Sequence, residues 1–358
     1  MDSNILYISI SFVASLIIAL AMTPFIIKIC QDKNLYDQPN GRKVHKLAIP
    51  RLGGTVFMPS MAIGVVTSLL IMYGDVHQNF DVYISTFVLA IGSLLIYLIG
   101  ILDDLNGMKA MHKFLIQLTT AIFFPLCNLS INNLHGLFGV HEIPIFLSYP
   151  LTLFVILLIV NAMNLIDGID GLSSSLTVMI LLAFTVLFHQ LHFGLFCLIS
   201  AGLAGAVLAF FFYNVFGKVG GLKIFMGDSG SLFIGYVIAY LAIKYQMSNE
   251  AAGLPYREES LLISWTLVFL PCIDVIRVAI MRKLKGKDMF EADMTHIHHR
   301  IMQTGLSMHL TLCVILALYL AFCLLNYGLY IGGLGMTWII LSNILLYGIF
   351  IKSVEAAR

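Results

Sequence analysis

The sequence predicts an all-α polytopic integral membrane protein with about eleven transmembrane helices. Three observations support this fold class. First, 59% of the 358 residues are hydrophobic and only 11% are charged, whereas soluble domains carry about 25% charged residues. Second, the mean hydropathy is +0.95. Third, apolar runs long enough to cross a bilayer, which takes about 20 residues, recur along the whole chain.

The first apolar run, residues 5–29, is longer than the core of a signal peptide. It lacks a basic segment before it and an A-x-A cleavage site, so we expect it to remain as a membrane anchor. Ten further runs follow, at 53–73, 82–102, 113–131, 149–165, 172–189, 193–214, 229–246, 260–281, 309–330 and 334–351. Together the eleven runs use most of the chain. We therefore expect a single transmembrane domain over residues 1–358.

The basic residues predict how the chain is oriented, because cytoplasmic loops are enriched in Lys and Arg. With the N-terminus outside, eighteen of the 20 Lys and Arg residues fall in inner loops or at inner span ends. Only Lys244 and Arg257 fall near the outer face. The C-terminus is then cytoplasmic.

The polar motifs all lie on the predicted inner face. The orientation was assigned from Lys and Arg residues, so it could equally have placed these motifs on both faces. The inner segments read DQPNGRKVHKLAIPRLGG, DDLNGMKAMHK, NLIDGIDG, GGLKIFMGDSGS and EADMTHIHHR. The outer segments are short and carry no comparable cluster. We therefore expect one composite active site at the cytoplasmic face.

The aspartate pair Asp103 and Asp104 has two interpretations. It could be a solvated pair that ends a helix. Alternatively, because adjacent carboxylates raise each other's pKa unless a cation lies between them, the pair could serve a metal ion or a proton transfer. Lys109 and Lys113, one helical turn apart, are by themselves typical of lysines at an inner membrane interface.

In NAMNLIDGIDG, two amides and two carboxylates recur at intervals of three residues, at Asn161, Asn164, Asp167 and Asp170. While a helix persists, neighbours in this series lie near one face. Amides inside an apolar run need partners, which favours a functional interpretation over solvated loop residues. Asp228, in GDSGS, precedes a span: it is either a helix N-cap or part of an anion and metal site at the helix N-terminus.

The HIHHR segment does not have zinc-site spacing, since no cysteine or carboxylate lies at the required intervals. Arg300 beside histidines fits phosphate binding better, because a guanidinium can form paired hydrogen bonds to phosphate. Asp274 and Arg277, three residues apart near the inner end of a span, predict a structural ion pair.

Carboxylates, amides and cations at span ends are suited to holding a metal-bound diphosphate. Mg²⁺ takes oxygen ligands, commonly one or two carboxylates plus substrate phosphates, and phosphoryl transfer depends mainly on positioning and charge neutralisation. A transporter would more often place its ionisable residues near mid-bilayer. The residues thus indicate a metal-assisted phosphoryl or phosphosugar transferase acting on a lipid.

The same motifs resemble a known family. DDLNGMKAMHK, NAMNLIDGIDG, FMGDSGS and HIHHR are similar to the motifs of the polyprenyl-phosphate N-acetylhexosamine-1-phosphate transferases, and PNGRKVHKLAIPRLGG to the first cytoplasmic loop of the WecA/TagO type. The resemblance implies transfer of N-acetylhexosamine-1-phosphate, most simply GlcNAc-1-phosphate, from a UDP-sugar to undecaprenyl phosphate with release of UMP. This would be the first membrane step of cell-surface polysaccharide synthesis.

The resemblance also implies roles for individual residues. Asp228 would bind Mg²⁺ (or Mn²⁺), with Asn164 as a possible second ligand. Asp103, Asp104, Asp167 and Asp228 would be the catalytic carboxylates, with the aspartate pair acting as base or positioning the metal. The expected substrate-binding residues are Lys113 at phosphate, Asp170 and Phe225 at the uracil, and His296, His298, His299 and Arg300 at the phosphates and sugar. Asn214 is left out, because the loop between it and Asp228 looks longer than in the muramoyl-pentapeptide branch.

The expected partners are undecaprenyl phosphate, a UDP-N-acetylhexosamine and membrane lipid, with no nucleic acid; a homodimer is left open. The implied location is the bacterial inner (cytoplasmic) membrane, as a multi-pass protein. Two alternatives remain at this point. One is the same chemistry on UDP-MurNAc-pentapeptide, although that branch usually carries three consecutive histidines where this chain has HIHHR. The other is a cation-coupled transporter.

Overall fold

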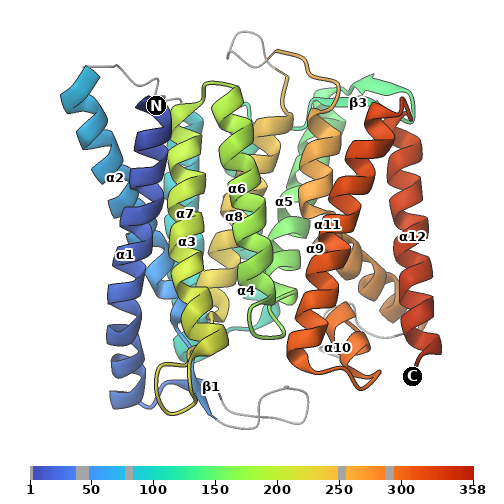
Figure 1. Cartoon of the computed structure of the whole chain (residues 1–358). Helices are drawn as coiled ribbons and strands as arrows, with labels where there is room; N and C mark the ends of the chain where they lie inside the picture. Colours follow the sequence, from blue (N-terminus) through green and yellow to red (C-terminus); the bar gives the residue numbers. More distant parts are fainter. Residues whose placement is uncertain (1–2, 38–47, 77–83, 249–254, 287–293) are drawn as a thin grey trace.

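The computed structural model describes residues 3–37, 48–76, 84–248, 255–286 and 294–358 as a bundle of long antiparallel helices (Figure 1). Arg42, Lys43, Lys46 and Lys287, counted above among the inner basic residues, lie outside the described residues, as do 82–83 of the third expected span. The helices are α1 Ser3–Asp32, α2 Phe57–Val76, α3 Ile84–Asn106, α4 Ala110–Leu126, α5 Ile145–Leu165, α6 Leu172–Gln190, α7 Gly194–Phe216, α8 Gly227–Gln246, α9 Ser260–Leu284, α10 Ile297–Met302, α11 Met308–Ile331 and α12 Met336–Ala356.

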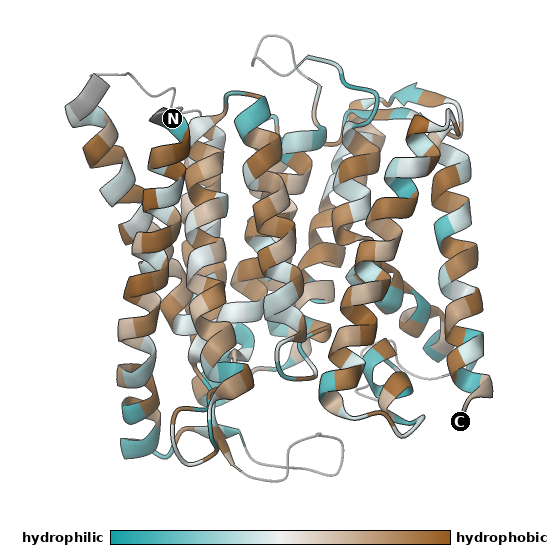
Figure 2. Ribbon diagram, in the orientation of Figure 1, coloured by the Kyte–Doolittle hydropathy of each residue, from teal (hydrophilic) through white to brown (hydrophobic). Residues whose placement is uncertain are grey.

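Each of the eleven expected spans coincides with one long helix, and the predicted fold class is confirmed. Within the described residues, nine helices are long and apolar enough to cross a membrane. The two other long helices are α4, with 17 residues, and α8, which carries polar residues at both ends. Hydrophobic residues make up most of the middle of the helices, and hydrophilic residues are more frequent toward the two ends of the bundle (Figure 2).

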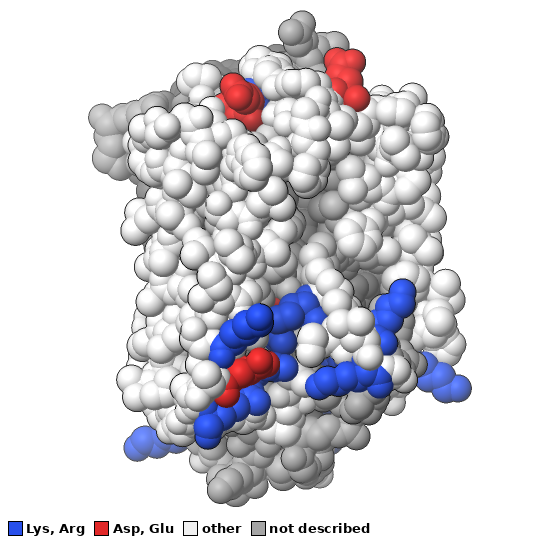
Figure 3. All heavy atoms as spheres, turned by 90° about the vertical axis from the view of Figure 1, so that its right-hand side faces the viewer, with Lys and Arg blue, Asp and Glu red and all other residues white. Residues whose placement is uncertain are grey.

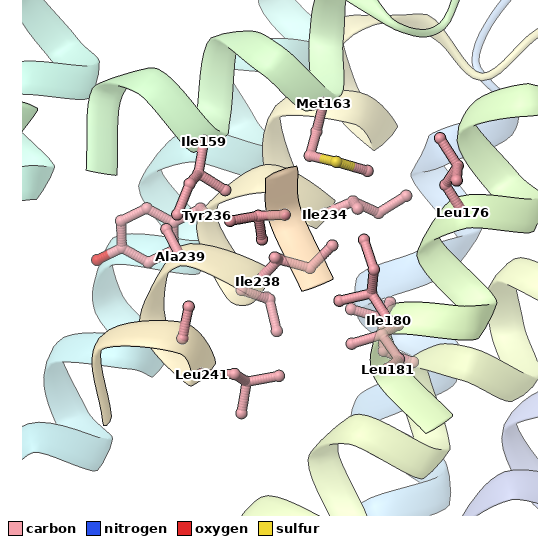
Figure 4. Close-up of a cluster of buried hydrophobic side chains, with 14 of the residues drawn as sticks. Ile159, Met163, Leu176, Ile180, Leu181, Ile234, Tyr236, Ile238, Ala239 and Leu241 are labelled. Atoms are coloured by element: carbon pink, nitrogen blue, oxygen red, sulfur yellow. The ribbon is translucent and has the colours of Figure 1, made fainter. Parts of the chain in front are cut away.

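Helix α8 lies at the centre of the bundle and is buried from Ser229 to Gln246. In Figure 4, Ile234 of α8 lies between Met163 of α5 and Leu176 of α6, and Tyr236 lies beside Ile159 of α5; all of these side chains are fully or almost fully buried. Such burial on every side accounts for a helix with polar end residues inside a membrane protein, because neighbouring helices rather than lipid surround it. Helix α8 therefore provides a rigid support for the residues at its start.

Short strands close the two ends of the bundle. At one end β1 Tyr36–Asp37 pairs antiparallel with β2 Ile49–Pro50. At the other end β3 Asn133–Leu137 pairs with β4 Val140–Glu142. The N-terminus lies at the β3 end and the C-terminus at the β1 end (Figure 1), as an odd number of spans requires. Lys and Arg side chains gather near the β1 end (Figure 3), in agreement with the predicted inner face.

Candidate active site

A cavity of about 780 Å³ opens at the β1 end of the bundle. The connection from β2 to α2, the start of α4, the α5–α6 and α7–α8 connections and the region from α10 to α11 all contribute to its wall. Nine of the predicted site residues line it: Asp103, Asp104, Lys113, Asn164, Asp167, Asp170, Phe225, Asp228 and His299. His296, His298 and Arg300 are not among the lining residues. Motifs separated by almost 200 residues thus meet in one place.

Asp104 caps the central helix. Its Oδ1 accepts a hydrogen bond from the backbone N–H of Asp228 at 2.8 Å, and its Oδ2 accepts one from the N–H of Ser229 at 3.0 Å. These N–H groups belong to the first turn of α8, where a carboxylate is favoured by the exposed donors and the helix dipole. Asp228 is therefore not the N-cap of α8, and the N–H donors expected to be available for an anion are taken by Asp104.

The carboxylate of Asp228, which does not cap α8, accepts hydrogen bonds from two other side chains. Its Oδ2 accepts a hydrogen bond from Nζ of Lys113 at 2.6 Å, and its Oδ1 accepts one from Nδ2 of Asn164 at 3.0 Å. Lys113 also donates to Oδ2 of Asp103 at 2.9 Å. Asn164 is fixed further by a 2.8 Å hydrogen bond to Oγ of Ser231. One lysine thus bridges two carboxylates that come from different helices.

The two amides of NAMNLIDGIDG separate into different roles. Nδ2 of Asn161 donates to Oε1 of Gln117 at 2.8 Å and to the carbonyl of Leu157 at 2.7 Å, so it joins α5 to α4 away from the cavity. Asn164, one turn later, reaches Asp228. The prediction that both amides need partners is confirmed, but only Asn164 lines the cavity.

Asp167 lies in the connection between α5 and α6, on the cavity wall. Burial, together with the neighbouring carboxylates Asp170, Asp228 and Asp104, raises its pKa to about 7. No hydrogen bond fixes its side chain among the described residues. A carboxyl group without a compensating cation in such surroundings is a frequent mark of a functional site.

Asp170 forms an ion pair that the sequence did not reveal. Its Oδ2 lies 2.6 Å from Nζ of Lys223, which also donates to the carbonyl of Asn214 at 2.8 Å. The side chain of Asn214 accepts a hydrogen bond from the N–H of Gly171 at 2.7 Å and donates to the carbonyl of Ile224 at 3.0 Å. Asn214 ties the α5–α6 connection to the segment before α8 and lines the cavity.

The lining residues that were not predicted as site residues include Arg51, Asn214 and Lys223. Asn214 ends a predicted span on the inner face, as Asn164 does, and that position was a usable signal. Arg51 and Lys223 were counted only as inner-face basic residues. Nothing in their spacing separates them from lysines and arginines that set membrane orientation.

The HIHHR segment forms α10 and is anchored by Asp274 of α9. Nδ1 of His296 donates to Oδ2 of Asp274 at 2.8 Å, and the N–H of Ile297 also donates to that carboxylate. Arg277 makes the predicted ion pair with Asp274, at 2.6 Å. Arg300 pairs with Glu355 of α12. In this structure His296 and Arg300 thus make contacts within the protein, and their roles in substrate binding stay predictions.

His298 packs against the α5–α6 connection. A Cβ placed on Gly168 would lie 2.1 Å from Nε2 of His298, so only glycine permits this approach. Burial, with His299 and His296 beside it, lowers the pKa of His298 to about 3. His298 is therefore neutral at physiological pH, whereas His299 reaches the cavity.

Acidic side chains outnumber basic ones on the described cavity wall. Six aspartates line it, against one arginine and two lysines: Asp37, Asp103, Asp104, Asp167, Asp170, Asp228, Arg51, Lys113 and Lys223. In the described part of the chain no three His, Cys, Asp or Glu residues are grouped as a complete metal site. Mg²⁺ does not need one, since it keeps several waters and binds one or two carboxylates plus substrate phosphates. Asp228 and the amide oxygen of Asn164 are oxygen donors of that kind.

Comparison with known proteins identifies the family. The model of glycosyl transferase family 4 matches residues 86–246. A Bacillus subtilis (strain 168) protein named "Probable undecaprenyl-phosphate N-acetylglucosaminyl 1-phosphate transferase" is 33% identical over 320 residues, which cover 88% of this chain and 83% of that protein. The chain belongs to glycosyl transferase family 4.

Two further members of glycosyl transferase family 4 extend the comparison. The undecaprenyl-phosphate alpha-N-acetylglucosaminyl 1-phosphate transferase of Escherichia coli O157:H7 is 28% identical over 361 residues, covering 98% of this chain and 92% of its own. The decaprenyl-phosphate N-acetylglucosaminephosphotransferase of Mycobacterium tuberculosis (strain CDC 1551 / Oshkosh) is 32% identical over 310 residues, covering 81% and 74%. The predicted resemblance to polyprenyl-phosphate N-acetylhexosamine-1-phosphate transferases is confirmed.

Proposed function

We propose that this protein transfers GlcNAc-1-phosphate from UDP-GlcNAc to undecaprenyl phosphate and releases UMP. One observation carries the proposal: the ordered inner-face motifs of a family 4 chain converge on one acidic cavity at the basic end of the bundle. The names of the relatives agree on the transferred group and on a polyprenyl phosphate acceptor. We expect the reaction to take place at the bacterial inner membrane, which the bacterial origin of the relatives and the predicted orientation support.

In the proposed reaction, an oxygen of the lipid phosphate attacks the phosphorus that carries the sugar. The bond from that phosphorus to the oxygen of UMP breaks, and UMP leaves with the electron pair. The result is a diphosphate that joins lipid and sugar. Because the groups that meet are all negatively charged, the chain must mainly position them and neutralise their charge.

Mg²⁺ (or Mn²⁺) bound by Asp228, with Asn164 as the second candidate ligand, would supply much of that neutralisation. Support comes from the excess of carboxylates on the cavity wall. Lys113 holds Asp228 and Asp103 in place through its two ion pairs. Phe225 and Asp170 line the same cavity, where the family resemblance assigns them to the uracil.

The contacts of Asp103 and Asp104 support a role in positioning other groups rather than a role as a general base. Both oxygens of Asp104 accept hydrogen bonds from α8, and those of Asp103 accept hydrogen bonds from Lys113 and from the N–H of Met108. In addition, the second pKa of a phosphate monoester is about 6, so the lipid phosphate is already largely dianionic at neutral pH. If Asp103→Asn lost activity and a higher pH restored it, the base role would be correct instead.

Purified protein supplied with undecaprenyl phosphate and single UDP-sugars tests the proposal. We expect UMP release with UDP-GlcNAc and none with UDP-MurNAc-pentapeptide. Turnover of the pentapeptide donor alone would instead support the peptidoglycan reaction. Uptake of a substrate into sealed vesicles without UMP release would support the transporter alternative and refute the transferase.

A further inference from the structure

Arg51 is fixed at the edge of the cavity by the backbone on either side of it. The N–H of Phe225 donates to the carbonyl of Pro50 at 2.8 Å, and the N–H of Gly53 donates to the carbonyl of Phe225 at 2.9 Å. Arg51 and Phe225 thereby form a parallel bridge. Because Phe225 leads directly into α8, the backbone of Arg51 is registered against the start of the central helix.

The side chain of Arg51 lines the cavity but is not neutralised there. Its Nε is shielded from solvent and has no hydrogen-bond partner, and Arg51 makes no ion pair with a described residue. The two other cations on the described wall are paired, Lys113 with Asp103 and Asp228 and Lys223 with Asp170. A guanidinium on the cavity wall that makes no ion pair with a described residue has its charge available for an anionic ligand.

Arg277, a structural arginine in the same protein, also has a buried Nε without a partner, but its charge is neutralised by an ion pair with Asp274. Arg277 donates to Oδ1 of Asp274 at 2.6 Å and to the carbonyl of Thr295 at 2.7 Å. These contacts join α9 to the segment before α10. Among the described residues, the side chain of Arg51 has no comparable partner, and backbone hydrogen bonds already join its segment to Phe225.

We propose that Arg51 binds a phosphate group of a substrate in this cavity. The proposal rests on the function proposed above and adds a specific residue to it. A guanidinium presents paired N–H donors that match phosphate oxygens, and this geometry is why arginine is common at such sites. Both the nucleotide donor and the lipid carry phosphate. The bridge to Phe225, which the family resemblance assigns to the uracil, places Arg51 on the nucleotide side.

The test compares Arg51→Gln, which removes the charge, with Arg51→Lys, which keeps it but loses the paired geometry. Lys109→Ala is the control, because Lys109 is exposed at the same end of the bundle and is not a lining residue. Steady-state UMP release gives kcat and KM for each substrate. Calorimetric binding of UDP-GlcNAc with Mg²⁺ and without lipid gives an affinity that does not depend on turnover.

In Arg51→Gln we expect the KM and the Kd for UDP-GlcNAc to rise by roughly 10- to 100-fold, the loss typical of a hydrogen bond between charged groups. In Arg51→Lys the KM and Kd for UDP-GlcNAc should rise by an intermediate factor. In Lys109→Ala these constants should change less than about twofold, and so should the KM for undecaprenyl phosphate in the Arg51 variants. A rise confined to the KM for undecaprenyl phosphate would support the phosphate contact and assign it to the lipid.

Unchanged KM values and an unchanged Kd in variants that melt like the wild type would overturn the proposal. Should Arg51→Gln not fold, Arg51→Lys alone decides by the same criteria. If the wild type released no UMP, the proposed function would fail, while UDP-GlcNAc binding by the variants would still test Arg51 separately.

Discussion

The buried Asp274 and the aspartates of the cavity wall, at the same end of this protein, differ in how their charge is compensated. Asp274 is 0% exposed and accepts hydrogen bonds from Arg277, His296, Tyr347 and the N–H of Ile297. The cavity wall carries six aspartates against three basic side chains among the described residues. Asp274 is buried with all its charge compensated, whereas the cavity wall is open and its described acidic side chains outnumber the basic ones.

This difference distinguishes an aspartate with a structural role from aspartates with a functional role. A buried carboxylate with every oxygen occupied joins α9, α10 and α12 and leaves nothing for a ligand. A surplus of carboxylates around a cavity is unfavourable unless a cation enters, because like charges raise one another's pKa. The raised pKa of Asp167 is an instance of this unbalanced environment. We therefore expect substitution of Asp274 to lower stability and substitution of the cavity aspartates to lower activity.

The largest effect on activity should come from Asp228→Asn. Removing the metal-binding charge should lower kcat/KM for UMP release by roughly 1,000-fold, since a metal ion supplies several kcal/mol at a phosphoryl centre. The melting temperature should stay near that of the wild type, because Asp104, not Asp228, caps α8. Asp32→Asn, an exposed residue at the same end of the bundle, is the matched control. Normal turnover in Asp228→Asn would remove it from the site.

The main effect of Asp274→Ala should be a loss of protein stability. Removing one partner of a buried ion pair costs about 3–5 kcal/mol, here by leaving Arg277 and Tyr347 without their acceptor. A thermal-shift measurement in detergent should show a melting temperature well below that of Asp228→Asn. If both variants melted like the wild type, the contrast between a structural and a functional cluster would be wrong.

Gly168→Ala should have a smaller effect that links the two regions. The added methyl group would collide with the ring of His298, and overpacking of this kind costs about 1–3 kcal/mol. We expect a lower melting temperature and a loss of kcat/KM of roughly tenfold, because the α5–α6 connection also positions Asp167 and Asp170. Gly348→Ala is the control, since a Cβ there meets nothing within 4 Å. Equal behaviour of the two variants would show that the Gly168–His298 contact is dispensable.

The smallest effect concerns pH. The pKa of Asp167 is raised to about 7, so the residue is largely protonated at pH 6 and largely ionised at pH 8. If its carboxylate form is the active one, kcat/KM should rise over this interval by roughly tenfold, the change in ionised fraction that a pKa near 7 produces. Asp167→Asn should keep only the shallower dependence that comes from the lipid phosphate, whose second pKa is about 6. Identical pH profiles would exclude Asp167 as the titrating group.

Much of the fold was predictable because the signal is local. Each apolar run long enough to span a bilayer became a helix, and the shared face of the motifs followed from the alternation of spans. Convergence of Asp104, Asp167 and Asp228 on one cavity was likewise expected from their placement at inner ends of spans. These predictions depend on the hydropathy of each run and on counting the spans, so they require no knowledge of how the helices pack.

The contacts between helices could not be predicted from the spacing of residues along the sequence. Asp104 appeared as half of an acidic pair, and its role as the cap of α8 depends on how α3 packs against α8. Asn214 was left out because of loop length, yet it ties two connections together. His296 and Arg300 are predicted to bind substrate, a prediction that stands, and the sequence did not show that they also contact Asp274 and Glu355. In each case the contact joins different elements of the fold, and the sequence does not show how those elements pack.

Binding of Mn²⁺ measured by electron paramagnetic resonance tests the central claim most directly. The claim is that the surplus of carboxylates around Asp228 forms a site for a divalent cation that is completed by the nucleotide. We predict that the wild type binds Mn²⁺, that UDP-GlcNAc strengthens this binding, and that Asp228→Asn loses both effects while Asp32→Asn keeps them. Equal Mn²⁺ binding by the wild type and Asp228→Asn, with or without UDP-GlcNAc, would contradict the account.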